Sequence, residues 1–131
     1  MLTAASIMTE ELVTIRPEAS IKEAIELLLK ESISGLPVVD HEGRLVGVIS
    51  EFAMLAMVYD HEVQSQAVGH HMTREVITVD YDDPISRIAD LCIVHRVRRL
   101  PVMKNGRLVG LIARRDVLRA LYSGAAAVCH A

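Results

Sequence analysis

The chain has 131 residues, the length of one domain or of two small units that share a core. Its 24% charged residues exclude wholesale disorder, and no apolar run approaches the roughly 18 residues of a membrane span. The net charge of −3 hides an asymmetry, because residues 1–63 carry −7 and residues 64–131 carry +4. Aromatic residues make up only 3%, so no base-stacking surface for nucleic acid is expected.

The first half is expected to begin with a strand over residues 12–15 and a helix opened by Ser20 and Glu23 as a capping box. Apolar residues at helical spacing predict the buried face of this helix: Ile21, Ala24, Ile25 and Leu28. A hairpin follows, with strands over 36–39 and 44–50. A second helix with an apolar stripe then closes this half: Met54, Leu55 and Val58.

A polar linker over residues 59–69 is expected to cross the surface before the second half begins. The second half is expected to have a strand over 76–79 and a helix capped by Asp83, with Pro84 in its first position. The predicted apolar stripe of this helix repeats the earlier one: Ile85, Ile88, Ala89 and Cys92. A hairpin over 100–103 and 107–113 turns through Asn105-Gly106, and a last helix follows with its own apolar stripe: Val117, Leu118 and Leu121. The tail from Gly124 either extends this helix or frays.

The two halves are copies of one motif. The tetrapeptide at residues 8–11 (MTEE) recurs at 72–75 (MTRE), and Leu36-Pro37-Val38 recurs 64 residues later. The pentapeptide GRLVG at 43–47 recurs unchanged at 106–110, now 63 residues later, so one residue is missing from the second turn. Ordered landmarks at a fixed offset predict repeats over residues 1–64 and 65–131. Each repeat reads β-α-β-β-α, so the fold class is α/β (α+β), with two repeats packed through their sheets under pseudo-twofold symmetry.

These motifs, in this order, resemble a tandem pair of CBS domains, also called a Bateman module, from about residue 7 to about residue 121. The resemblance implies a regulatory protein that is not an enzyme and that forms a homodimer. It further implies adenosine-containing ligands such as AMP, ADP or ATP in clefts between the repeats, as effectors rather than obligatory cofactors. Such binding is commonly read out by a partner enzyme or channel.

The family's ligand motif is a Gly, two hydrophobic residues, Ser or Thr, two variable residues and Asp. Residues 110–116 end in the Asp, Asp116, but carry Ala113 in place of the hydroxyl. Residues 47–53 carry the hydroxyl, Ser50, but Ala53 replaces the Asp. A carboxylate in this position can accept hydrogen bonds from both ribose hydroxyls.

By resemblance, each ligand contacts the motif of one copy and the first strand and pre-proline segment of the other. The better cleft is then expected to be lined by Asp116, Ala113, Arg115, Leu111, Leu12, Val13, Ile33, Ser34, Gly35 and Pro37. The poorer cleft is expected to be lined by Ser50, Val76, Ile77, Val97, Arg98, Arg99 and Pro101, with Phe52 filling part of it.

Other interpretations of these residues are open. Four arginines (Arg98, Arg99, Arg114 and Arg115) form either a phosphate-binding cluster or a solvated basic surface. Asp116 can serve as a helix-start charge rather than a ribose ligand, and Ser50 is better explained as a helix N-cap. The glycines of the pentapeptide allow positive φ and close approach.

No metal site and no catalytic triad are expected. The histidines at 61, 70 and 71 and the pair Cys129-His130 lack a recognised ligand spacing. Cys92 on a helix stripe is expected to be a buried, free thiol, which fits a cytoplasmic protein with no secretory signal.

The leading hypothesis is therefore an adenine-nucleotide-binding regulatory module, and the main alternative is a ligand-free structural or dimerisation module. A metal- or redox-responsive protein and a protein that binds duplex DNA through its basic half are weaker alternatives.

Overall fold

The computed structural model describes residues 1–130 of the chain, with side chains described through Gly124. The chain forms two compact units. The first-repeat unit is Val13–Val76, and the second-repeat unit combines Met1–Leu12 with Ile77–Ala131. Each unit thus contains most of one repeat together with the Met-Thr segment that opens the other.

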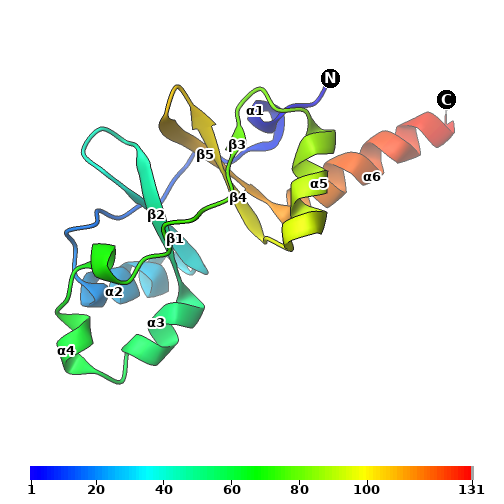
Figure 1. The fold of residues 1–131 in the computed structure, drawn as a ribbon. Coiled ribbons are helices and arrows are strands. Elements are labelled where there is room, and N and C mark those ends of the chain that lie inside the picture. Colours follow the sequence, from blue (N-terminus) through cyan, green and yellow to red (C-terminus); the bar gives the residue numbers. More distant parts are fainter. Residues whose placement is uncertain (131) are drawn as a thin grey trace. The chain divides into compact units, whose positions relative to one another are not determined.

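In the first-repeat unit, a two-stranded antiparallel hairpin is flanked by helices (Figure 1). Its elements are α2 (Ile21–Glu31), β1 (Gly35–Val39), β2 (Leu45–Ser50), α3 (Glu51–Met57), α4 (His61–Gln64) and the 3-10 helix η1 (Val68–His70). Ser20 caps α2 as predicted, because its hydroxyl accepts a hydrogen bond from the Glu23 N–H at 3.1 Å. The short helix α4 interrupts the segment expected to be a plain linker, and Asp60 caps it.

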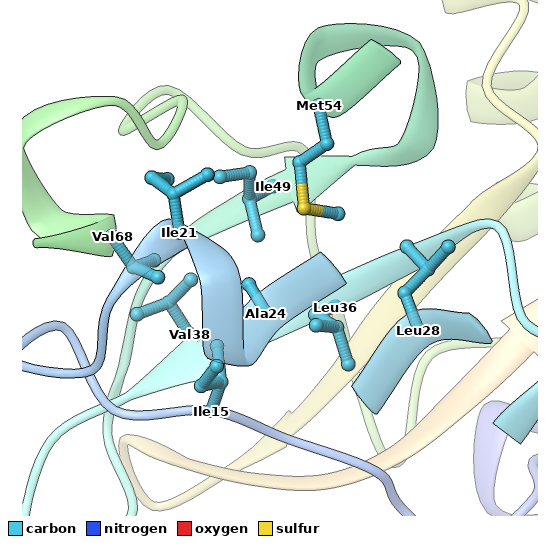
Figure 2. Packing of buried hydrophobic residues seen from close by; sticks show 9 residues of the cluster. All are labelled: Ile15, Ile21, Ala24, Leu28, Leu36, Val38, Ile49, Met54 and Val68. Atoms are coloured by element: carbon cyan, nitrogen blue, oxygen red, sulfur yellow. The ribbon is translucent and has the colours of Figure 1, made fainter. Parts of the chain in front are cut away.

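The core of the first-repeat unit lies between α2 and the hairpin (Figure 2). Three predicted stripe residues of α2, Ile21, Ala24 and Leu28, are buried there. They pack with residues of the hairpin and of both flanking segments: Ile15, Leu36, Val38, Ile49, Met54 and Val68. This core contains no aromatic side chain, as the composition predicts.

The second-repeat unit has a three-stranded sheet in the order β3-β4-β5. Its elements are α1 (Ala4–Ile7), β3 (Val79–Asp80), α5 (Ile85–His95), β4 (Arg99–Lys104), β5 (Arg107–Ala113) and α6 (Arg114–His130). Strand β3 is parallel to β4 and β5 is antiparallel to it, which confirms the predicted crossover followed by a hairpin. The buried residues form one cluster: Ala4, Val79, Ile88, Cys92, Leu100, Val102, Ile112 and Val117.

The first strand of each repeat is much shorter than predicted. Only Ile15 bridges to Val38 in the first-repeat unit, and β3 has only two residues. The Ile15 N–H donates to the Pro37 carbonyl oxygen at 3.1 Å. To extend the parallel ladder toward the start of the strand, the backbone N–H of residue 37 would have to donate the next hydrogen bond. Proline has none, so the ladder stops there, and Pro101 occupies the same place beside β3.

The cap of α5 also differs from the prediction. The helix begins at Ile85 after Pro84, which has no side-chain cap hydrogen bond. The Asp83 carboxylate instead accepts from the backbone N–H of Asp80 at 2.8 Å and thus closes the turn before the helix.

The turns of the two hairpins explain the missing residue in the second repeat. In the second hairpin Asn105 and Gly106 have φ of 52° and 79°, so both central residues of a two-residue turn are left-handed. The first hairpin has a longer turn that ends at Gly43, with φ of 80°. The Asp40 carboxylate stabilises this longer turn by accepting from the backbone N–H groups of Glu42 and Arg44, both at 2.9 Å.

The Met-Thr segments bind to the edges of the hairpins. Thr9 exchanges two backbone hydrogen bonds with Leu111, at 2.8 and 3.0 Å, and Thr73 does the same with Val48 at 2.8 and 2.9 Å. The methionine before each threonine lies over a glycine of the repeated pentapeptide, Met8 over Gly110 and Met72 over Gly47. These glycines therefore allow close approach, as predicted, whereas Gly43 and Gly106 supply positive φ.

Replacing Gly47 by alanine is expected to destabilise the first-repeat unit. The added Cβ would lie 2.7 Å from the Met72 sulfur and 2.7 Å from the Thr73 carbonyl oxygen, which is backbone and cannot rotate away. We expect a loss of about 1–3 kcal/mol in the free energy of unfolding, measured by chemical denaturation. Gly124→Ala is the control: its Cβ meets nothing within 4 Å, so it should be neutral or slightly stabilising. An equal loss in both variants would contradict the role of close approach.

Two aspartates are expected to give opposite pH dependences. The hydrogen bond with the Asp82 carboxyl, then burial, then the charges of Asp82 and Asp83 raise the pKa of Asp80. A carboxyl with a raised pKa contributes stability at acidic pH that is lost as pH rises through that pKa. Asp82→Asn should therefore be more stable than the wild type at neutral pH, with the difference vanishing in acid.

The matched control is Asp40→Asn. Hydrogen bonding from the Arg44 N–H, followed by that from Glu42 and by the Arg44 guanidinium, lowers the pKa of Asp40 despite some burial. The ionised Asp40 carboxylate therefore stabilises the folded state at neutral pH, and this stabilisation is lost as pH falls through the lowered pKa. The Asp40→Asn variant should thus be less stable than the wild type at neutral pH. Melting temperatures recorded from about pH 3 to about pH 7 test both signs.

The closing helix of each repeat buries fewer apolar residues than predicted. Met54 and Val117 are buried, but Leu55 and Leu118 are 63% and 69% exposed, and Val58 and Leu121 are 42% and 41% exposed. The prediction failed because α3 packs against α2 and β2, and α6 packs against α5, β5 and α1, and these contacts leave the rest of each predicted stripe exposed. No helix in the described part of the chain combines the length and hydropathy needed to cross a membrane.

Candidate functional site

The carboxylate of Asp116 lies in the first turn of α6, directly after β5. An acidic side chain is favourable here, because the helix N-terminus carries partial positive charge. Asp116 is about one-third exposed, and its Oδ1 accepts a hydrogen bond from Arg119 Nη1 at 3.1 Å. The sequence interpretation missed Arg119, although its spacing of three residues on a helix is a usual signal for such a pair.

A basic cluster surrounds the start of α6. The Arg114 N–H donates to the Arg98 carbonyl oxygen at 2.8 Å, and Arg99 is the register partner of Ala113 across the hairpin. The hairpin thus brings the pre-proline segment and the Asp motif of the same repeat together. We call this place, defined by Arg98, Arg99, Arg114, Arg115, Asp116 and Arg119, the β5–α6 junction; all its arginines are exposed.

The groups around the junction restrict what it can bind. Both backbone groups of Leu111 are engaged by Thr9, so this residue can offer only its half-buried side chain to a ligand. Arginine guanidinium groups bind phosphate oxygens, and a carboxylate accepts from hydroxyls. The junction therefore has the groups needed to bind a molecule that carries both an anion and a diol.

The equivalent junction of the first-repeat unit has the same backbone but different chemistry. The Glu51 N–H donates to the Ser34 carbonyl oxygen at 2.9 Å, and Gly35 pairs with Ser50. The Ser50 hydroxyl accepts from the Ala53 N–H at 3.2 Å, which confirms it as the N-cap of α3. The positions equivalent to those of the β5–α6 junction carry no basic residue: Ser34, Gly35, Glu51, Phe52, Ala53 and Ala56.

The predicted groupings draw on both compact units. Leu12, Leu111, Ala113 and Arg115 share the second-repeat unit with Asp116, whereas Val13, Ile33, Ser34, Gly35 and Pro37 belong to the first-repeat unit. In the second predicted grouping, Ser50 and Val76 belong to the first-repeat unit, and the other members belong to the second-repeat unit: Ile77, Val97, Arg98, Arg99 and Pro101. Pro37 and Pro101 are buried, while Val13, Ile33, Ile77 and Val97 are half-buried against the cores.

The histidine and cysteine candidates are not part of the β5–α6 junction. His71 Nε2 lies 2.6 Å from Gln66 Oε1, and the part of the chain with described side chains holds no group of three possible metal ligands. The pair Cys129-His130, considered above as a possible metal-ligand pair, lies outside the residues whose side chains are described. Cys92 is a buried free thiol, as predicted, and burial raises its pKa.

Two repeats of one α/β motif, each with an equivalent strand-to-helix junction, define a tandem-repeat module. The family model of the CBS domain matches residues 4–60 and 68–123, and the chain belongs to the CBS domain family.

Solved structures of CBS-pair proteins have the same fold. CBSX2 in complex with AMP aligns with a TM-score of 0.83 and 31% identity, covering 94% of this chain and 98% of that chain; CBSX2 comes from Arabidopsis thaliana. The CBS domain pair of protein MJ0100, in complex with 5-methylthioadenosine and S-adenosyl-L-methionine, aligns with a TM-score of 0.79 and 29% identity, covering 95% and 98%.

Curated relatives include larger proteins. The inosine-5'-monophosphate dehydrogenase of Methanocaldococcus jannaschii is 34% identical over 117 residues, which is 88% of this chain but 23% of that enzyme. The chain spans between 14% and 42% of the first four curated relatives that it matches. Relatives named as enzymes are therefore similar to this chain only in part of their length.

Proposed function

We propose that this chain is a regulatory module that binds an adenosine-containing nucleotide at the β5–α6 junction. The observation that carries the proposal is the single carboxylate of Asp116 among exposed arginines at the start of α6. Asp116 would accept hydrogen bonds from the ribose hydroxyls, and Arg114 and Arg115 would contact the phosphates. Arg98 and Arg99, which the sequence assigned to the other cleft, would join them, because the β4–β5 hairpin brings them beside Arg114 and Ala113. The complexes of related CBS pairs with AMP, 5-methylthioadenosine and S-adenosyl-L-methionine support the adenosine part.

The rest of this proposed site follows from the family resemblance. Residues of the first-repeat unit (Val13, Ile33, Ser34, Gly35 and Pro37) would complete an apolar slot for the adenine, together with Leu12 and Leu111. The second site, around Ser50, would bind nucleotide more weakly or not at all. Ala53 offers no acceptor for a ribose there, and Phe52 stands where Arg115 stands in the other repeat.

The chain would act as a homodimer in the cytoplasm and signal to a partner protein. The buried free thiol of Cys92 is compatible with a reducing compartment. Nucleotide binding would shift a conformational equilibrium only by the difference in affinity between its two states, and a partner would read that shift.

Nucleotide-dependent melting tests the proposal. AMP, ADP or ATP at about 100 times its dissociation constant should stabilise the wild type by about 2.7 kcal/mol. Asp116→Asn keeps the shape of the side chain but removes its charge, and should lose roughly ten- to hundredfold in affinity, because hydrogen bonds to charged groups contribute about 1.5–3 kcal/mol each. Asp90→Asn, on the exposed surface of α5, is the matched control and should bind like the wild type.

Arginine variants separate the two ends of the ligand. Arg98→Gln combined with Arg115→Gln should weaken ATP more than AMP and leave adenosine unchanged, because only phosphates contact these groups. If no adenosine compound shifts the melting temperature of the wild type, the nucleotide proposal is wrong. The exposed apolar residues of α3 and α6 would then favour the second candidate function, a ligand-free dimerisation module.

A further inference from the structure

The repeated Met-Thr segments carry a contact that nucleotide binding does not use. Met8 and Met72 are both half-buried, and each sulfur lies against a glycine of the repeated pentapeptide. A Cβ added at Gly110 would lie 2.5 Å from the Met8 Sδ. A Cβ added at Gly47 would lie 2.7 Å from the Met72 Sδ. Each sulfur therefore fills the space that a side chain would otherwise take, close to the backbone of the glycine.

The same hydrogen bonds hold both methionines in place. We call residues 4–9 the Met-Thr clip of the second-repeat unit. The Met8 N–H donates to the carbonyl oxygen of the fully buried Ala4 at 3.0 Å, and the threonine that follows pairs with Leu111 at the edge of β5. Residues 68–73, which lie 64 positions later, form the Met-Thr clip of the first-repeat unit with the equivalent bonds.

A thioether can be oxidised at the sulfur without breaking the chain. With hydrogen peroxide, a lone pair of the sulfur attacks one peroxide oxygen, so that an S–O bond forms and the O–O bond breaks. The proton of the transferred oxygen passes to the departing hydroxide, which leaves as water. The sulfur thus loses two electrons and the peroxide gains them. The product is methionine sulfoxide, which is polar and which sulfoxide reductases return to methionine.

The surroundings of each sulfur are unsuited to a sulfoxide. The backbone N–H groups of Met8, Thr9 and Leu111 all donate to carbonyl oxygens already. None of these three groups can donate to a sulfoxide oxygen without giving up its present bond, and the contact with Gly110 is already close. A polar group that is partly removed from water and lacks a hydrogen-bond partner is costly in free energy. Oxidation is therefore expected to detach the clip from the edge of β5.

We propose that Met8 and Met72 are reversible oxidation sites, at which a hydroperoxide loosens the Met-Thr clips. The burial of the other methionines sets two useful limits. Met1 is fully exposed, so its oxidation alters no packing, whereas Met54 is 3% exposed and is shielded from the oxidant. The two clip methionines lie between these limits and hold backbone pairing in place. The inference does not depend on nucleotide binding.

Mass spectrometry on the full chain tests the proposal. Dilute hydrogen peroxide should oxidise the clip methionines more slowly than Met1 and faster than Met54. Dithiothreitol added afterwards returns cysteine sulfenic acids and disulfides to thiols but leaves sulfoxides in place. Amides of the clips and of the hairpin edges beside them should then exchange with solvent at least about fivefold faster, because each clip loses its backbone pairing.

Reversal in the wild type provides the first control. Sulfoxide reductases of both stereochemical classes should restore slow exchange, because only the sulfur atoms have changed. Sulfoxide at Met8 and Met72 with unchanged exchange would overturn the inference. Oxidation of these two residues as slow as that of Met54 would overturn it as well.

Leucine variants provide the second control. Met8→Leu conserves volume and should fold, and peroxide should no longer quicken exchange over residues 4–9. Residues 68–73 should still respond in this variant, and Met72→Leu should give the converse result. Exchange over 4–9 that quickens equally in Met8→Leu and in the wild type would assign the effect to another residue and refute the proposal. If either variant fails to fold, reductase reversal in the wild type decides the question alone.

Discussion

Deletion of residues 1–12 is expected to unfold the second-repeat unit and to leave the first-repeat unit folded. The deleted segment contributes Ala4, which is fully buried, and the half-buried Ile7 and Met8 to the second-repeat core. It also contributes backbone hydrogen bonds to Asp83, Tyr81, Ile85 and Leu111. We estimate a net loss of about 3–5 kcal/mol after the entropy of ordering the segment is subtracted, a large part of the usual stability of a domain.

Hydrogen exchange read by mass spectrometry measures this effect separately for the two units. Amide protection should disappear over residues 77–124 and persist over the core segments of 13–76. A synthetic peptide of residues 1–12 added in excess should restore protection, which distinguishes loss of the segment from damage to the rest of the chain. Unchanged protection over 77–124 would show that the segment is dispensable. Nucleotide binding should vanish with the deletion, because Asp116 belongs to the affected unit.

The second large effect is expected from cavities at two equivalent leucines. Leu36 and Leu100 are 1% and 0% exposed and precede the proline of each hairpin. Replacement of either by alanine should cost about 2–5 kcal/mol, because the surrounding side chains relax only partly into the space. Leu36→Ala should lower protection over 13–76, and Leu100→Ala should lower it over residues 77–124.

The matched variants are the methionine replacements at the same positions. Leu36→Met and Leu100→Met conserve volume and should cost less than about 1.5 kcal/mol. Denaturant titration gives the free energies, and hydrogen exchange gives their location. Simultaneous loss of protection in both units from one alanine variant would contradict the separation of the two cores.

Local signals predicted most of the fold. The helix stripe of Ile21, Ala24 and Leu28 and the Asn105-Gly106 turn depend only on residues near one another in the chain, and the structure confirms both. The first strands were overestimated because their ladder ends at Pro37 and Pro101, which are distant in sequence. The exposure of Leu55 and Leu118 was also missed, because a periodic pattern does not reveal whether another element covers that side of the helix.

The sequence predicted which residue types the candidate site contains, but not the contacts among them. The Asp in the family motif and the arginine cluster follow from sequence alone. The pairing of Asp116 with Arg119 and the bond from Arg114 to Arg98 required coordinates, because helix and hairpin geometry bring those atoms together. The use of the Leu111 backbone by Thr9 depends on a segment more than 100 residues away in the sequence.

The placement of the Met-Thr segments has a consequence for how this protein can be divided. The sequence repeats have their boundary at about residue 64, whereas the compact units have theirs at residues 12 and 76. The boundaries of the repeats and of the folding units therefore differ by about a dozen residues. A fragment of residues 13–76 is therefore expected to be a complete folding unit as a continuous polypeptide. An isolated second half would need residues 1–12 attached through a new linker, in the manner of a circular permutation.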